Sequence, residues 1–236
     1  MLRFASSASS HIGLKRVLQE DAVLGRPEIG LWAVVDGMGG HDRGDLASRR
    51  IVDGLAALRA PSTSSSFLVA VQASLASAHD ALNATPSAAG LPGGATCVVL
   101  MAWRDHFTCL WAGDSRLYQL RNRLIRRVTR DHSRVRELVE AGEIDEDEVD
   151  DHPEANVVTR AIGAGTVFEP EVARGSLLRG DSLLLCSDGV TRVLDDDRLA
   201  RIMSGSAPEG AAESVIEAVL EGGAPDNASA VVVTVL

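Results

Sequence analysis

The chain has 236 residues, 45% of them hydrophobic and 24% charged, which supports one folded domain with a sizeable core and excludes wholesale disorder. Lys and Arg number 23 against 33 Asp and Glu, so the formal net charge is −10. This balance argues against a nucleic-acid partner, because phosphate backbones are bound by basic faces.

The cysteines and the apolar runs limit the class of protein further. Three widely spaced cysteines (Cys97, Cys109 and Cys186) predict neither a disulfide framework nor a zinc ribbon. The first ten residues lack the apolar stretch of a signal peptide, and no run approaches the ~20 residues of a membrane helix. We expect a single domain over residues 1–236, located in the cytoplasm, monomeric, and without membrane insertion.

Short apolar runs separated by turn residues predict antiparallel strands, since parallel crossovers need a dozen residues or more. In chain order we expect a strand over 30–35, helices over 47–58 and 67–82, strands over 97–101, 107–111, 117–120 and 124–125, a polar acidic segment with a short helix and a further helical excursion over 131–160, a strand over 182–186, a helix from 208 to 221, and a strand over 230–235. Serines 64–66 are expected to cap the second helix, and Pro208 to begin the last one. This order predicts an α+β fold, with antiparallel sheets covered by helices.

Aspartates stand where the apolar strands end. Asp36, Asp114 and Asp188 each follow a predicted strand, and Asp226 precedes the last one. Any one of them alone is typical of a turn. Four carboxylates on rigid strand ends repel one another unless cations neutralise them, and oxygen ligands without His or Cys suit Mg²⁺ or Mn²⁺.

Two neighbouring segments have alternative interpretations. Arg16, four residues before Glu20, either forms an exposed ion pair with it or binds a phosphate through its guanidinium fork. The glycine-dense segment 36–41 is either a hairpin turn or a phosphate-binding loop. His41, at its end, is either a solvated loop histidine or a proton donor.

Ordered motifs over nearly the whole chain resemble the metal-dependent serine/threonine protein phosphatases of the protein phosphatase 2C type, in their compact bacterial form. The matching segments are Arg16-Val17-Leu18-Gln19-Glu20-Asp21, with Gln19 where the family has Asn, then Asp36-Gly37-Met38-Gly39-Gly40-His41, Gly94-Ala95-Thr96, Gly113-Asp114-Ser115-Arg116, Thr159-Arg160-Ala161-Ile162-Gly163, Cys186-Ser187-Asp188-Gly189 and Pro225-Asp226-Asn227-Ala228.

The resemblance implies a four-layer αββα sandwich and a centre with two Mn²⁺ or Mg²⁺ ions. It implies that Asp36 bridges the ions, that Asp188 and Asp226 complete one shell, and that Glu20 and the Gly37 carbonyl serve the other. Asp21 would orient bound water. Asp114, together with Asp188, would hold a third and weaker ion beside a flap over residues 131–160.

The implied reaction is hydrolysis of phosphoserine and phosphothreonine in proteins. A water shared by the two ions would attack phosphorus as hydroxide. Arg16 would bind the phosphate and His41 would protonate the leaving oxygen. The expected partners are phosphoproteins made by a serine/threonine kinase, and the kinase itself.

Two other functions compete with this one. Cys186 and Arg192 have the spacing of thiolate phosphatases, but Asp188 inside that loop would repel a phosphate, and Cys186 closes an apolar strand. We therefore reject a thiolate mechanism. A non-catalytic phosphoprotein-sensing module on the same fold remains the alternative, although every expected metal aspartate is present.

Overall fold

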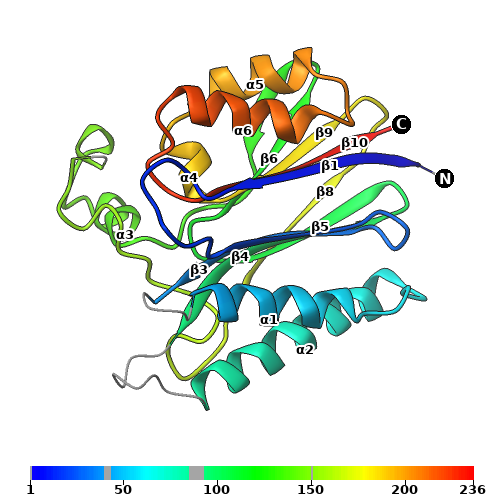
Figure 1. Cartoon of the computed structure of the whole chain (residues 1–236). Helices are drawn as coiled ribbons and strands as arrows, with labels where there is room; N and C mark the ends of the chain where they lie inside the picture. The colour runs from blue at the N-terminus through cyan, green and yellow to red at the C-terminus, as the bar shows by residue number, and fades with distance from the viewer. Residues whose placement is uncertain (1, 40–43, 85–92, 150) are drawn as a thin grey trace.

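The computed structural model describes residues 2–39, 44–84, 93–149 and 151–236. Within them, two five-stranded antiparallel sheets stack face to face, with helices on both outer faces (Figure 1). The first sheet has the order β1 (Phe4–His11), β10 (Ala228–Val235), β9 (Ser182–Cys186), β6 (Arg116–Arg121) and β7 (Leu124–Arg127). The second has the order β2 (Asp21–Arg26), β3 (Leu31–Met38), β4 (Gly94–Trp103), β5 (His106–Ala112) and β8 (Glu171–Ser176). The predicted four-layer αββα sandwich is confirmed.

The helices cover the sheets in pairs. Helices α1 (Gly44–Ala56) and α2 (Ser64–Asn83) lie on the second sheet, and α5 (Asp196–Gly205) and α6 (Ala211–Glu221) lie on the first (Figure 1). A single turn, α4 (Asp188–Thr191), follows β9. The flap contains α3 (Arg134–Ala141) and a 3₁₀ turn over Glu146–Glu148, and it projects from one end of the sandwich.

Three apolar layers hold the sandwich together. Trp32, Val98 and Val231 are fully buried between the sheets, while the opposite faces of the same strands pack against the helices. Leu75 of α2 and Val215 of α6 are fully buried in the two outer layers. Strands that are buried on both faces read as continuous apolar runs, which is why β3, β4, β9 and β10 could be predicted.

Several local expectations are corrected by the structure. Thr63, rather than serines 64–66, is the N-cap of α2, and it forms a reciprocal capping box with Ser66. Helix α6 begins at Ala211, because residues 208–210 form a turn instead of the first helical turn. Beyond α3 the flap contains only the 3₁₀ turn and loops among its described residues, so the expected helical excursion is short.

The topology gathers the expected site residues at one end of the sandwich. This end, beside the flap, is where the site segments meet: the start of β2, the end of β3, the β5–β6 turn, the end of β9 and the start of β10 (Figure 1). Both chain termini lie at the opposite end. No helix within the described ranges is long and apolar enough to cross a bilayer.

Candidate active site

Asp36 lies at the centre of a carboxylate cluster. It is directly opposite Asp21 in the register of β2 and β3. Burial raises the pKa of Asp36 well above its ordinary value, and the charges of four neighbouring aspartates raise it further. Those neighbours, in order of decreasing effect, are Asp21, Asp188, Asp114 and Asp226. The structure therefore brings together all five predicted aspartates, from segments up to 205 residues apart.

Asp21 is buried, and only one of its two carboxylate oxygens has a hydrogen-bond partner. Its Oδ2 accepts a hydrogen bond from the Ser187 hydroxyl at 2.8 Å, while its Oδ1 is buried without a hydrogen-bond partner. Burial is the main cause that raises the pKa of Asp21 to about 7, with Asp188 and Asp226 adding repulsion. A buried carboxylate oxygen that has no donor is costly unless something cationic faces it.

Glu20 lies against the start of α1. Its Oε1 is likewise buried without a partner, although the Gly44 backbone N–H contributes a hydrogen bond to this carboxylate. Burial raises the pKa of Glu20 despite the opposing charge of Arg16. A Cβ on Gly44 would stand 2.2 Å from Glu20 Oε1, and one on Gly37 would stand 2.1 Å from the Gly44 carbonyl. Both glycines are therefore required by close packing at the predicted ligands.

Two polar side chains, which were not among the site residues expected from the sequence, fix this geometry. Asn227 accepts a hydrogen bond from the Glu20 backbone N–H and donates to the carbonyls of Ile12 and Leu18, so it holds the segment that carries Glu20. Ser187 accepts from the Ser229 N–H while donating to Asp21. In the sequence, only their positions next to Asp226 and Asp188 pointed to these two residues. Their hydrogen-bond partners lie more than 40 residues away along the chain, so the partners could not be predicted from residue spacing.

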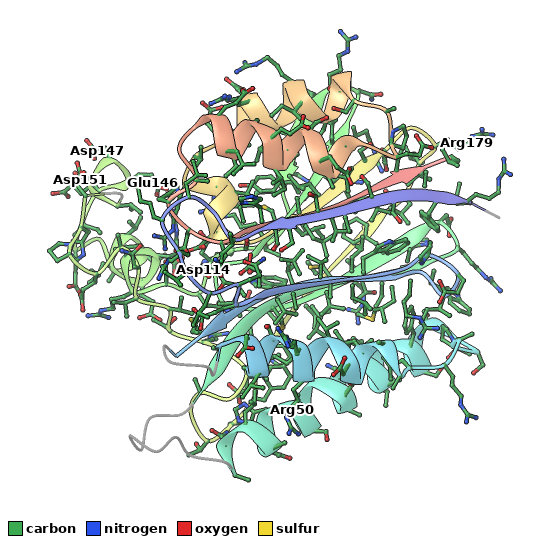
Figure 2. The ribbon with its side chains drawn as sticks, viewed as in Figure 1. Arg50, Asp114, Glu146, Asp147, Asp151 and Arg179 are labelled. Atoms are coloured by element: carbon green, nitrogen blue, oxygen red, sulfur yellow. The ribbon has the colours of Figure 1, made fainter. Side chains whose placement is uncertain are left out.

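Asp114 occupies the β5–β6 turn, between the sheets and beside the flap (Figure 2). Burial and the charge of Asp188 raise the pKa of Asp114 to about 7. The turn is held by a buried hydrogen bond between the hydroxyls of Thr96 and Ser115, 2.7 Å apart. His132 at the base of the flap bonds both the N–H and the carbonyl of Gly113, so the flap is tied to the turn that carries Asp114.

Two arginines face the cluster. Arg16 lies 2.7 Å from Asp226 Oδ2, and Arg192 lies 2.5 Å from Asp188 Oδ2. Arg16 therefore pairs with Asp226, which removes the alternative of an ion pair with Glu20. The pKa of Arg16 is raised, chiefly by its hydrogen bond to Asp226.

The residues fit divalent cations by their donor set, although the side chains are not closed around one. Among the described residues, no three carboxylate, imidazole or thiol groups converge on one point as the ligands of an ion would. The donors available are nevertheless all oxygens, two of them are buried and unpartnered, and the carboxylates repel one another. Mn²⁺ and Mg²⁺ are the ions that such a set prefers.

The sequence also offers a histidine and a cysteine as candidate catalytic groups. His41 lies outside the described residues, so its placement is not part of the geometry above. Cys186 is fully buried at the end of β9, and burial raises the pKa of its thiol to about 12. A thiolate nucleophile at this position is therefore excluded, in agreement with the sequence.

Comparison with known families gives the same result. Residues 3–228 match the family described as Protein phosphatase 2C. The chain belongs to this family. It is 32% identical over 240 residues to the serine/threonine protein phosphatase PstP of Mycobacterium tuberculosis, a match that covers all of this chain and 45% of PstP. The chain thus spans about half the length of that relative.

A shorter relative and two solved structures match along nearly their full length. A putative protein phosphatase 2C-type protein of Streptococcus pyogenes is 30% identical over 92% of each chain. PppA of Pseudomonas aeruginosa, described as a key regulatory component of T6SS, is 41% identical with a TM-score of 0.91, over 99% of this chain and 98% of that one. The catalytic domain of PstP in complex with two manganese ions is 29% identical with a TM-score of 0.85, over 100% of both chains.

Proposed function

We propose that this chain is a metal-dependent phosphatase that hydrolyses phosphoserine and phosphothreonine in proteins. The observation that carries the proposal is Asp36, which faces four other carboxylates at the sheet ends where the family motifs meet. Two Mn²⁺ or Mg²⁺ ions, when bound there, would supply an activated water and neutralise the charge of the phosphate.

Each residue of the cluster receives a role in this proposal. Asp36 would be shared between two ions, as its central position suggests. Asp188 and Asp226 would complete one ligand set, and Glu20 with the Gly37 carbonyl the other. Asp21, held by Ser187, would accept a hydrogen bond from bound water through its unpartnered Oδ1.

Arg16 would move from a carboxylate to the substrate. Its side chain is 53% exposed, so the guanidinium can turn from Asp226 toward a phosphate without breaking core contacts. Asp226 would release Arg16 more readily when it serves as a metal ligand, because its Oδ2 is the atom that now accepts from Arg16. His41 is proposed as the proton donor to the leaving serine or threonine oxygen.

The substrates are proposed by similarity. PppA, with 41% identity, is described as a key regulatory component of T6SS, and PstP as a serine/threonine protein phosphatase. We infer that this chain, acting as a monomer in the cytoplasm, opposes a serine/threonine kinase and acts on the kinase and its substrates. Phosphoproteomes of a strain lacking the protein and of a strain carrying Asp36→Asn should show the same accumulating phosphosites.

A direct assay tests the activity itself. Purified protein should release phosphate from a phosphothreonine peptide with Mn²⁺ or Mg²⁺ and lose this activity in excess EDTA, whereas thiol alkylation should have no effect. The alternative is a non-catalytic phosphoprotein sensor. That alternative predicts peptide binding without turnover at any concentration of Mn²⁺ or Mg²⁺, and this outcome would refute the enzymatic proposal.

A further inference from the structure

The Arg192 side chain folds back onto Asp188, the first residue of the helical turn that immediately precedes Arg192. Helix α4 is a single turn, so residue 192 stands directly above residue 188. The Arg192 Nε and a terminal nitrogen both donate to Asp188 Oδ2, at 2.8 and 2.5 Å. Asp188 is 16% exposed and Arg192 is 38% exposed, so the pair sits at the mouth of the site.

The guanidinium also acts on Asp114. Asp114 and Asp188 line one cavity of about 820 Å³ between the flap and the sandwich, together with Arg192. Arg192 is close enough to Asp114 for its charge to oppose the rise in the pKa of that carboxyl. The Arg192 guanidinium therefore interacts with both Asp188 and Asp114, the two carboxylates expected to hold the third and weaker ion.

The other arginines of this cavity have different partners. Arg116 forms a forked pair with Asp131, Arg127 lies 3.5 Å from the same carboxylate, and Arg136 forms a forked pair with Glu146 of the flap. Neither partner belongs to the central cluster. Among the described arginines that line the cavity, Arg192 is thus the one that is paired with a carboxylate of the proposed ion site.

We propose that Arg192 is an internal counter-ion of Asp188, which a divalent ion must displace before it binds to the Asp114–Asp188 pair. The inference rests on the ion requirement of the proposed function. Two Arg192 N–H groups donate to Asp188 Oδ2 and use both lone pairs of that oxygen, so an ion that binds this oxygen must release Arg192. Binding at this pair is therefore weakened by the protein's own side chain, while the ligand set of Glu20 and the Gly37 carbonyl, which does not include Asp188, is unaffected.

Calorimetric titration of the metal-free protein with Mn²⁺ tests the proposal. Arg192→Met keeps the apolar stem and removes the charge, and it should bind the weak ion about tenfold more tightly than the wild type. The tight ion assigned to Glu20 and the Gly37 carbonyl should change less than about twofold, because Asp188 is not among its proposed ligands. Arg192→Lys should restore weak binding, because it restores a cation. Arg136→Met is the matched control from the same cavity and should behave as the wild type.

A further variant locates the effect. In Asp114→Ala/Arg192→Met the tighter binding should disappear, because the ion loses its second carboxylate. Circular dichroism checks the fold of each variant, and Arg192→Gln replaces Arg192→Met if the latter unfolds. Equal or weaker affinity for the weak ion in the charge-removing variants would overturn the inference while leaving the proposed function in place. Absence of any Mn²⁺ binding to the wild type would overturn both.

Discussion

At the scale of single residues, the site is a set of like charges that the fold holds together. The carboxyls of Asp36, Asp21 and Asp114 all have raised pKa values because they are buried beside one another. Ion binding would reverse this repulsion. Such a cluster is retained for chemistry at the expense of the stability of the metal-free protein.

Asp36→Asn tests this view by separating activity from stability. We expect kcat on a phosphothreonine peptide to fall by several orders of magnitude, because the shared ligand loses its charge. The melting temperature in EDTA should stay the same or rise, since one buried charge is removed from the cluster. A variant that is both folded and fully active would contradict the assignment of Asp36.

Gly44→Ala tests the packing behind Glu20. Alanine at the first position of a helix is ordinarily neutral or stabilising relative to glycine, by about 0.4–1 kcal/mol. At Gly44 the added Cβ would stand 2.2 Å from Glu20 Oε1 and 2.8 Å from the Gly37 carbonyl carbon, so both predicted ligands must move.

We expect Gly44→Ala to weaken the tight Mn²⁺ binding measured by calorimetry and to lower kcat. Gly205→Ala is the control, because a Cβ on Gly205, in the last turn of α5, meets nothing within 4 Å. Unchanged Mn²⁺ affinity in Gly44→Ala would show that Glu20 does not need its present position.

At the scale of elements, polar pairs fix how the strands of the first sheet meet their turns. Arg121, at the end of β6, donates to both carboxylate oxygens of Asp181, at 2.7 and 2.6 Å. Asp181 precedes β9, is 1% exposed, and also accepts from the Leu178 N–H. Burial alone would raise the pKa of Asp181, but the hydrogen bonds from Arg121 and Leu178 outweigh burial and lower it.

This pair predicts a pH-dependent contribution to stability. Arg121→Met should lower the free energy of unfolding by about 2 kcal/mol at pH 7, the range for hydrogen bonds to charged groups. Because the pKa of Asp181 lies lower in the folded state than in the unfolded chain, its contribution is complete above about pH 4 and is lost as pH falls through the folded pKa. Denaturant titrations of the wild type and the variant should therefore converge below about pH 4. Arg123→Met, on the exposed turn, should differ little from the wild type at any pH.

The elements that could be predicted from the sequence are those with a strong local pattern. The buried strands β3, β4, β9 and β10 have apolar runs, and α1 and α2 have helical stripes. Strand β1, with four serines among eight residues, has no such pattern. It forms a strand because it pairs with β10 along its whole length. The single turn α4 is too short to show a period.

The aspartates of the site could also be predicted, because each one ends or precedes a readable strand. Their partners could not. Arg16 and Asp226 are 210 residues apart, and Ser187 and Asp21 are 166 apart. These contacts depend on the stacking of the two sheets. The i, i+4 pair of Arg192 and Asp188 was in range of the sequence, but only the structure shows that the helical turn places it in the cavity.

At the scale of the whole molecule, the charge cluster makes the stability of the metal-free protein depend on pH. The carboxyls of Asp21 and Asp114 keep their protons up to about pH 7 in the folded state, whereas they lose them near 3.8 in an unfolded chain. Above pH 4 the unfolded state is thus favoured progressively as pH rises, because it releases those protons more readily. Each fully responding group contributes a slope of about 1.4 kcal/mol per pH unit.

We therefore expect the melting temperature in EDTA to fall as pH rises from 5 to 7.5. Saturating Mn²⁺ should abolish most of this fall, because an ion that neutralises the cluster removes the advantage of protonation. The stabilisation by Mn²⁺ should accordingly be larger at pH 7.5 than at pH 5. Asp36→Asn should show a shallower slope in EDTA, since it removes a carboxyl whose own pKa is raised by burial and by the neighbouring aspartates. Parallel melting curves with and without Mn²⁺ across this range would mean that the carboxylates are not where the ions bind.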